Sequence, residues 1–177
     1  MTSPSKAKGN SFERLVADFL SNLYGETFIR VPGSGAYVGG KNVHRKQYLH
    51  EEQIRNFKGD IVPGPSFPRF NAECKSYKDF PFHQLFTGNV KILDTWIGQC
   101  CEVADPGDFN ILFLKFNRKG TYVAVQLPCS GNPSQTFNLS KHFIYDSNLN
   151  GSWAIMDLDT FFKSNSASVK TLCQSAN

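Results

Sequence analysis

The chain has 177 residues, the length of one ordinary domain that can bury its own hydrophobic core. Hydrophobic residues make up 40% and aromatic residues 14% of it, which excludes a disordered or low-complexity protein. No apolar run reaches the roughly 18 residues of a membrane span, and the first residues lack the apolar stretch of a secretory signal. We therefore expect one globular domain that lies in the cytoplasm and has no membrane partner.

The formal net charge of +4 is the difference between two unlike halves of the chain. Residues 1–91 hold 13 Lys and Arg against 8 Asp and Glu, whereas residues 92–177 hold 6 against 7. The total alone is too small to indicate a polyanionic partner. The positive excess nevertheless lies in the half that carries the candidate catalytic residues described below.

The first predicted element is an amphipathic helix near the N-terminus. Apolar residues recur at helical spacing from Phe12 to Leu23, and Gly25 ends the helix. Residues 1–9 before it are polar and basic, and we expect them to be flexible.

Two short strands and a basic insert follow. Thr27–Val31 is predicted to be a strand, and Pro32 opens a Gly-rich turn. Residues 37–58 mix basic and aromatic side chains, which suits a segment that grips DNA phosphates and stacks on bases, and equally suits a solvated loop. A strand beginning at Asp60 and another over Phe70–Lys75 flank a Pro-rich turn.

The second half begins with the longest predicted helix, over Phe82–Val103. Ile111–Phe116 and Tyr122–Leu127 are predicted to form a hairpin, because the turn residues of Asn117–Gly120 separate them. The remaining features are, in chain order, a loop-rich stretch over residues 128–151, a strand over Trp153–Met156, a short helix over Leu158–Lys163 and a flexible tail over residues 164–177.

This order of elements predicts the fold class. Strands outnumber helices, and helices occur at the start, middle and end of the chain. We expect a single α/β domain over residues 1–177, with a central mixed β-sheet flanked by few helices.

Asp60, Glu73 and Lys75 form the most informative pattern in the sequence. Side chains alternate between the two faces of a strand, so Glu73 and Lys75 point to one face while Ala72 and Cys74 suit a buried face. If the strand that begins at Asp60 pairs with Phe70–Lys75, two carboxylates and an ammonium group converge.

Such a cluster suits metal-dependent hydrolysis of a phosphodiester. One or two carboxylates are the usual protein ligands of Mg²⁺, and the metal polarises the phosphoryl oxygen and acidifies a bound water. A lysine beside the metal can orient that water or stabilise the developing charge. The five Cys and four His residues lack zinc-site spacing and suit reduced thiols in the cytosol.

The three residues resemble the motif of the PD-(D/E)XK nuclease superfamily, although Gly59 stands where the motif has proline. The flanking sequence narrows the resemblance. A basic-Gly-x-x-x-Glu-Arg helix (Lys8–Arg14) precedes Arg-x-x-Gly-Ser-Gly-Ala (Arg30–Ala36), the Asp and the Glu-Cys-Lys-Ser strand. This order, over residues 8–76, looks like that of archaeal-type Holliday-junction resolvases, except for the insert before the Asp.

The resemblance implies a restriction-endonuclease-like fold and a role for each motif residue. Asp60 and Glu73 would ligate Mg²⁺, which Mn²⁺ can replace, with the backbone carbonyl of Cys74 as a third ligand. Glu13 would complete the acidic cluster. Lys75 would serve the attacking water.

The resemblance also implies DNA as the partner, branched and resolved by a homodimer, because symmetric cuts on two strands need two active centres. Such an enzyme works in the cytoplasm of a prokaryotic or phage-infected cell. Ser34 would lie near the scissile phosphate. The residues expected to contact DNA are Lys8, Arg14, Arg30, Lys41, Arg45, Lys46 and Lys58.

Ordinary structural explanations and other functions stay open at this point. Glu13 would also complement the dipole at a helix start, Ser34 would also suit a plain turn, and the basic residues would also suit a solvated surface. A restriction- or repair-type endonuclease and a DNA-binding module without cleavage are the alternatives. Gly35–Asn42 resembles a phosphate-binding loop but lacks its final hydroxyl residue, which disfavours an ATPase.

Overall fold

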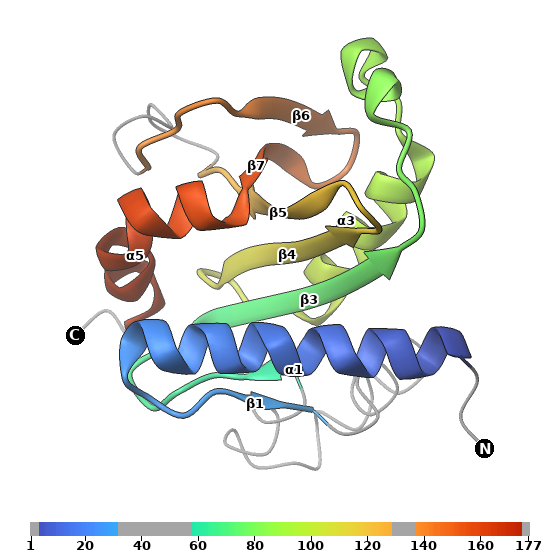
Figure 1. Cartoon of the computed structure of the whole chain (residues 1–177). Helices are drawn as coiled ribbons and strands as arrows, with labels where there is room; N and C mark the ends of the chain where they lie inside the picture. The colour runs from blue at the N-terminus through green and yellow to red at the C-terminus, as the bar shows by residue number, and fades with distance from the viewer. Residues whose placement is uncertain (1–3, 32–57, 129–136, 175–177) are drawn as a thin grey trace.

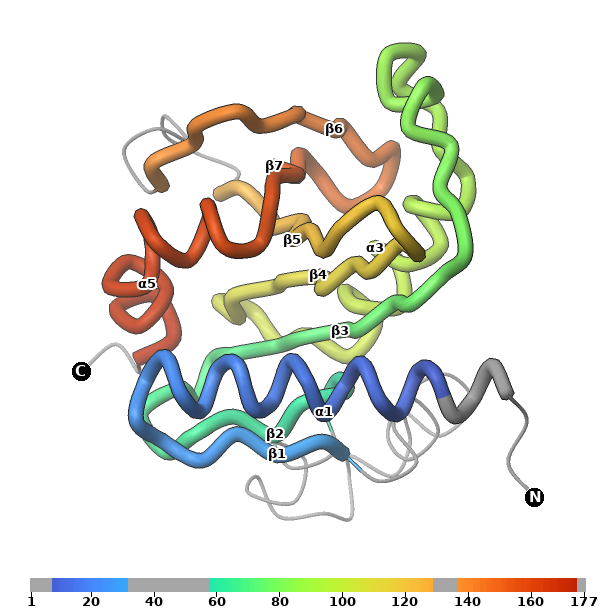
Figure 2. Tube along the Cα trace, in the orientation of Figure 1, coloured from blue at the N-terminus to red at the C-terminus, as the bar shows by residue number. Residues whose placement is uncertain are grey.

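The computed structural model describes residues 4–31, 58–128 and 137–174, and the side chains of the first helix from Lys8 onward. Helices lie on both sides of a central sheet (Figures 1 and 2). The elements are α1 (Pro4–Tyr24), β1 (Ile29–Arg30), β2 (Ile61–Val62), β3 (Phe70–Tyr77), the 3₁₀ helix η2 (Phe82–Thr87), α3 (Lys91–Val103), β4 (Phe109–Phe116), β5 (Gly120–Gln126), β6 (Phe143–Ser147), β7 (Gly151–Asp157) and α5 (Leu158–Cys173).

The central sheet has five strands in the order β3-β4-β5-β7-β6. β3 and β4 are parallel, whereas the other neighbouring pairs are antiparallel. β1 and β2 form a separate two-stranded antiparallel sheet, which lies near α1 at the β3 side of the molecule (Figure 2). The expected α/β domain with a mixed central sheet and flanking helices is confirmed.

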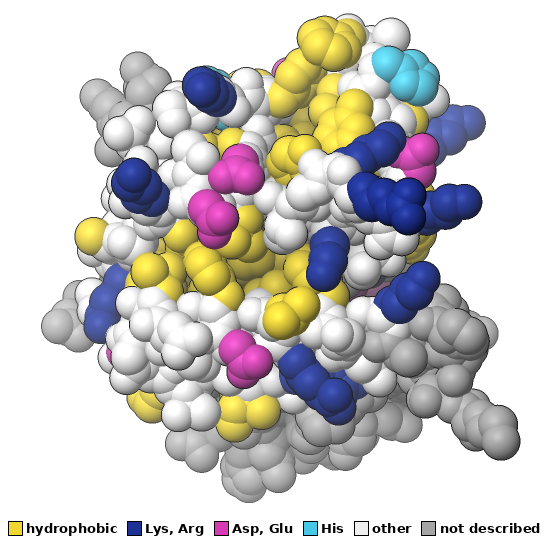
Figure 3. All heavy atoms as spheres, in the orientation of Figure 1, with side chains coloured by type: hydrophobic (Ala, Val, Ile, Leu, Met, Phe, Trp, Pro, Cys, Tyr) yellow, Lys and Arg dark blue, Asp and Glu magenta, His cyan; other side chains and the backbone are white. Residues whose placement is uncertain are grey.

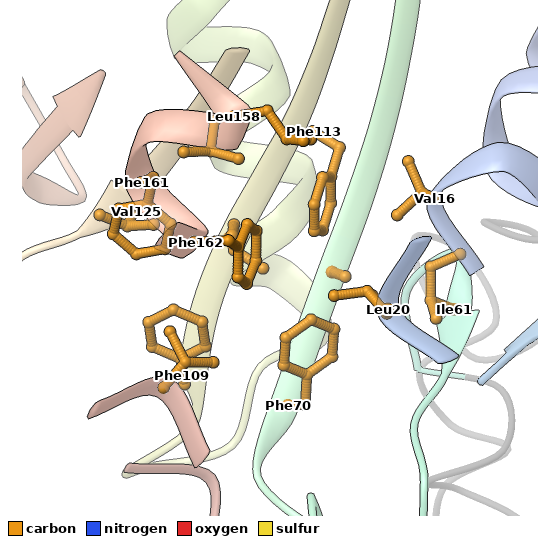
Figure 4. Close-up of a cluster of buried hydrophobic side chains, with 14 of the residues drawn as sticks. Val16, Leu20, Ile61, Phe70, Phe109, Phe113, Val125, Leu158, Phe161 and Phe162 are labelled. Carbon is orange, nitrogen blue, oxygen red and sulfur yellow. The ribbon is translucent and has the colours of Figure 1, made fainter. Parts of the chain in front are cut away.

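β4 shows how the sequence builds a core on each face of the sheet. Ile111 and Phe113 belong to the core under α1 and α5, whereas Leu112 and Leu114 belong to the core under α3. This division follows from the alternation of side chains along a strand, and a strand covered on both faces is apolar at nearly every position. On the α5 side, the Phe113 ring stacks on Phe162 with centroids 6.0 Å apart (Figure 4).

The predicted helix over Phe82–Val103 is wrong in its first part. A 3₁₀ helix ends at Gly88, whose φ of 67° is left-handed, and the α-helix begins only at Lys91. Glycine adopts this conformation without the steric cost of a side chain, so the 3₁₀ helix can end there. The longest helix in the described part of the chain is α1, with 21 residues.

The ends of the chain are more ordered than expected. The helix predicted to stop at Lys163 continues to Cys173, because Asn165, Val169 and Cys173 carry the buried face onward. The first helix likewise begins at Pro4 and includes most of the expected lead-in. The stretch expected to be loop-rich contains β6, an edge strand of the central sheet.

A search of the described helices for a membrane-crossing segment finds none with the necessary length and apolar character.

Candidate active site

Asp60 is fixed against β3 by hydrogen bonds of its backbone and its side chain. Its N–H donates to the Ala72 carbonyl at 2.8 Å, and its Oδ2 accepts from the Cys74 N–H at 2.7 Å. The residue is only 5% exposed. The strand after Asp60 was expected to pair with β3, but β2 pairs with β1 instead. Asp60 still reaches the expected place beside Glu73.

Glu73 and Lys75 point together toward the α3 side of β3. The Lys75 ammonium donates to Glu73 Oε1 and to Gln99 Oε1 of α3, both at 2.6 Å. Their side chains are only 13% and 15% exposed. Burial, followed by the neighbouring Asp60 carboxylate, raises the pKa of Glu73 to about 7 despite the opposing charge of Lys75.

Glu13 brings a third carboxylate from α1. Its Oε2 accepts from Arg30 Nε at 2.5 Å, and the same guanidinium donates to Asn10 at 2.9 Å. Burial first, and then the Asp60 charge, raise the pKa of Glu13. Glu13 therefore interacts electrostatically with Asp60, and its ion-pair partner is Arg30, a residue predicted to contact DNA.

The chemistry of this cluster fits a hard divalent cation. Burial, and then the neighbouring Asp60 charge, raise the pKa of Glu13 and of Glu73, and a bound cation would offset both effects. Within the described residues, no group of three or more Asp, Glu, His and Cys side chains is arranged as a ready metal site. The candidate protein ligands are the Asp60 and Glu73 carboxylates, which lie beside each other, with a backbone carbonyl and waters completing the shell.

The sulfur of Cys74 is a poor candidate ligand. Its side chain packs against the core under α1, and burial raises the pKa of the thiol well above its usual range. A neutral thiol binds metal weakly, because the thiolate is the ligand form. The candidate metal ligand at this position is therefore the backbone carbonyl of Cys74, which is also the group that the superfamily resemblance implies.

Comparison with known proteins identifies the family. A model of the family described as "Phage putative PDDEXK endonuclease" matches residues 4–170. The chain belongs to this PDDEXK endonuclease family. No protein of curated function and no solved structure matches it. The resemblance to the PD-(D/E)XK superfamily is thereby confirmed.

Apart from Arg30, the residues predicted to contact DNA, together with the candidate catalytic residue Ser34, fall into three groups in this PDDEXK family member. Lys8 and Arg14 are exposed on α1, as a DNA contact requires. Lys58 is buried and forms ion pairs with Asp108 and, at 2.7 Å, with Asp105, so the structure removes it from the set. Ser34, Lys41, Arg45 and Lys46 lie outside the described residues.

Two polar residues of the site were not found by sequence reasoning. Gln99 accepts a hydrogen bond from Lys75, and Asp108 is the buried partner of Lys58. Gln99 is one polar position on an amphipathic helix, and Asp108 is a loop residue after Pro106-Gly107. Nothing in their local sequence separates them from solvent-facing polar residues, because both contacts depend on long-range packing.

Proposed function

We propose that the chain is a metal-dependent endonuclease that hydrolyses DNA phosphodiester bonds. The observation that carries the proposal is the convergence of Asp60 and Glu73 with Lys75 on one strand edge, in a chain of the PDDEXK endonuclease family. A DNA-binding module without cleavage would not need to bury three like charges, which costs stability without a bound cation.

Asp60 and Glu73 would hold the metal, Mg²⁺ or Mn²⁺. When bound, the cation supplies a Lewis acid beside the scissile phosphate and lowers the pKa of a coordinated water. Lys75 is held by Glu73 and Gln99 so that its ammonium stays beside the carboxylates. From there it would orient the attacking water and offset charge on the phosphate. Glu13 would hold the same water network from α1.

A branched DNA such as a Holliday junction is the proposed substrate. The support is the order of motifs over residues 8–76, which resembles that of the archaeal-type resolvases. Cutting two strands symmetrically would require a two-fold homodimer. A restriction- or repair-type endonuclease would use the same active centre on plain duplex.

The test compares cleavage of a four-way junction, a linear duplex, a flap and a single strand. Each is incubated in Mg²⁺, in Mn²⁺ or in EDTA with wild type, Lys75→Ala and a control, Lys163→Ala, which removes an exposed lysine from α5. We expect metal-dependent cleavage of the junction by wild type and the control, and a loss of at least about 100-fold for Lys75→Ala.

The outcomes separate the parts of the proposal. Cleavage of none of the four DNAs in either metal, or full activity of Lys75→Ala, would overturn the nuclease. Equal cleavage of duplex and junction would keep the nuclease and reject the resolvase. Light scattering of the junction complex would show whether two copies bind one junction.

A further inference from the structure

The tip of the β4–β5 hairpin lies at the end of the strand that carries the active site. The Asn117 N–H donates to the Tyr77 carbonyl at 3.1 Å, which joins the hairpin to the last residue of β3. Glu73 and Lys75 lie earlier on the same strand. The hairpin is therefore attached rigidly to the catalytic strand.

Basic side chains gather around this junction. Within residues 76–79 and 115–120, the only acidic residue is Asp79, which pairs with Lys119 at 2.5 Å on the surface. Figure 3 shows dark-blue side chains grouped on the side where β3 and β4 end in Figure 1. We call this group the hairpin basic cluster, and its members are Lys78, Lys115, Arg118 and Lys119.

Most of the cluster is exposed, although the Lys119 ammonium is paired with Asp79. Lys78, Arg118 and Lys119 are exposed, and Lys115 is half-buried with its ammonium 5.7 Å from the centre of the Phe12 ring of α1. Phe12 directly precedes Glu13 in that helix. Lys115 thus lies on the α1 face of the sheet, whereas Lys78 and the turn residues lie beyond the end of β3.

Arg118 occupies a strained backbone position. Its φ of 60° is left-handed, a conformation that glycine and asparagine adopt more readily than arginine. The turn around it is held by the Lys119 N–H to the Phe116 carbonyl at 3.0 Å and by the Tyr122 hydroxyl to the Lys119 carbonyl at 2.6 Å. A strained, exposed arginine adds nothing to the core, so its charge is the property that the position offers.

The spacing suits a nucleic-acid backbone. Lys78 is three residues beyond Lys75, and a strand rises about 3.3 Å per residue, so their backbones are roughly 10 Å apart. A duplex advances about 3.4 Å along its axis for each phosphate of one strand. A duplex bound at Lys75 therefore presents further phosphates within this distance.

We propose that the hairpin basic cluster binds the backbone of duplex DNA beside the phosphate that the active site cuts. The inference rests on the proposed nuclease function, since that function places DNA at Lys75. The cluster supplies sequence-independent affinity and sets the position of the DNA along the site.

The test measures binding of a fluorescein-labelled DNA duplex by anisotropy in EDTA, over a series of NaCl concentrations. The variants are Arg118→Gly, Lys115→Ala and Lys141→Gly. Lys141 is a matched control, because it is also exposed, basic and left-handed (φ 48°) but precedes β6, at the sheet edge opposite β3. Thermal unfolding of each variant is measured in parallel.

We expect Arg118→Gly to bind about 3- to 10-fold more weakly, with the slope of log K against log [salt] reduced by about 0.9, the value for one lost phosphate contact. Lys115→Ala should behave similarly. Both glycine variants should unfold at the same or a higher temperature than wild type, since the strain is relieved. Lys141→Gly should keep wild-type binding.

An unchanged affinity and salt slope for Arg118→Gly would overturn the proposal, as would an equal loss for Lys141→Gly. Cleavage assays on the same preparations distinguish this failure from that of the nuclease. Wild type that cuts DNA with no dependence on Arg118 rejects only the cluster. Wild type that binds through Arg118 but never cuts in Mg²⁺ or Mn²⁺ rejects only the nuclease, and no binding rejects the cluster.

Discussion

The carboxylate of Asp60 accepts the backbone N–H of Cys74 at 2.7 Å, so a backbone group of the catalytic strand holds a candidate metal ligand. The Asp60 N–H returns a bond to the Ala72 carbonyl at 2.8 Å. The two bonds bracket Glu73 and set the separation of the two acids. Both bonds involve backbone groups of β3 at buried or partly buried positions, so breaking them would leave those two groups unsatisfied.

Gly59 makes this approach possible, and Gly59→Ala should destroy it. Its φ is +65°, and a Cβ there would lie 2.4 Å from the Ala72 carbonyl oxygen, the acceptor of the Asp60 bond. We expect a loss of about 2–3 kcal/mol in the free energy of unfolding and loss of metal-dependent thermal stabilisation. Urea denaturation and thermal shift with and without Mg²⁺ measure both.

Gly25→Ala is the matched control for that substitution. Gly25 has nearly the same φ, +67°, but no atom lies within 4 Å of the position that a Cβ would take there. It should lose only the cost of the left-handed backbone, roughly 1 kcal/mol, and keep the response to Mg²⁺. Equal effects of the two alanines would show that steric contact with β3 is unimportant.

Lys58 and Asp108 form a buried ion pair that links the segment before Asp60 to the loop after α3. The stability of the fold should therefore depend on this pair. Their side chains are 7% and 5% exposed. Lys58→Met would leave the Asp108 carboxylate buried without its cation and should cost about 3–5 kcal/mol of unfolding free energy. Asp108→Asn should cost less, because Lys58 would keep Asp105 as a partner. The double variant should cost much less than the sum.

A double-mutant cycle in urea measures this coupling. Because Asp105 also contacts Lys58, Asp105→Asn serves as a comparison, and its more exposed side chain (56%) should make its effect smaller. Strictly additive losses for Lys58→Met and Asp108→Asn would contradict the ion-pair account.

The parts of the site that depend on local sequence were predictable. Strand alternation places Glu73 and Lys75 on one face whatever the rest of the fold does, and the short turn from Asp60 to Phe70 leaves that acid nearby. Lys58 shows the opposite case. It is one basic residue in a basic stretch, and only the distant Asp108 makes it a buried residue.

The fold was predictable to a similar degree and for the same reason. The hairpin of β4 and β5 follows from its turn residues, and β3 from its alternation. The break at Gly88 and the continuation of α5 beyond Lys163 were missed. The break follows the left-handed backbone of Gly88. The continuation of α5 follows tertiary packing, since its buried face includes Asn165, a polar residue that the hydrophobic pattern does not mark.

Glu26 should stabilise the fold in a pH-dependent way. It accepts the Ser66 N–H at 2.9 Å and pairs with Lys170 at 3.3 Å, and these contacts, the Ser66 bond foremost, lower its pKa. A lowered pKa in the folded state gives stability above the ordinary value that is lost as the pH falls through the folded value.

Glu26→Gln should therefore cost about 1–2 kcal/mol at neutral pH, with the difference from wild type shrinking as the pH falls below the ordinary pKa of 4.5. Urea denaturation across this range measures it. Asp18→Asn, which removes an exposed carboxylate from α1, is the control. A difference that stays constant from neutral to acid pH would contradict the assignment.

Glu73 should have the opposite effect, because its pKa is raised to about 7, by burial first and by Asp60 second. A raised pKa gives stability that is present below the ordinary value of 4.5 and is lost as the pH rises through about 7. In EDTA, Glu73→Gln should therefore be more stable than wild type at alkaline pH, by at most about 3 kcal/mol, and the two should converge in acid. Added Mg²⁺ should stabilise wild type at alkaline pH but not the variant, since the cation offsets the repulsion only where both carboxylates are present. A variant less stable than wild type at alkaline pH in EDTA would show that the Lys75 ion pair outweighs the burial of the charge.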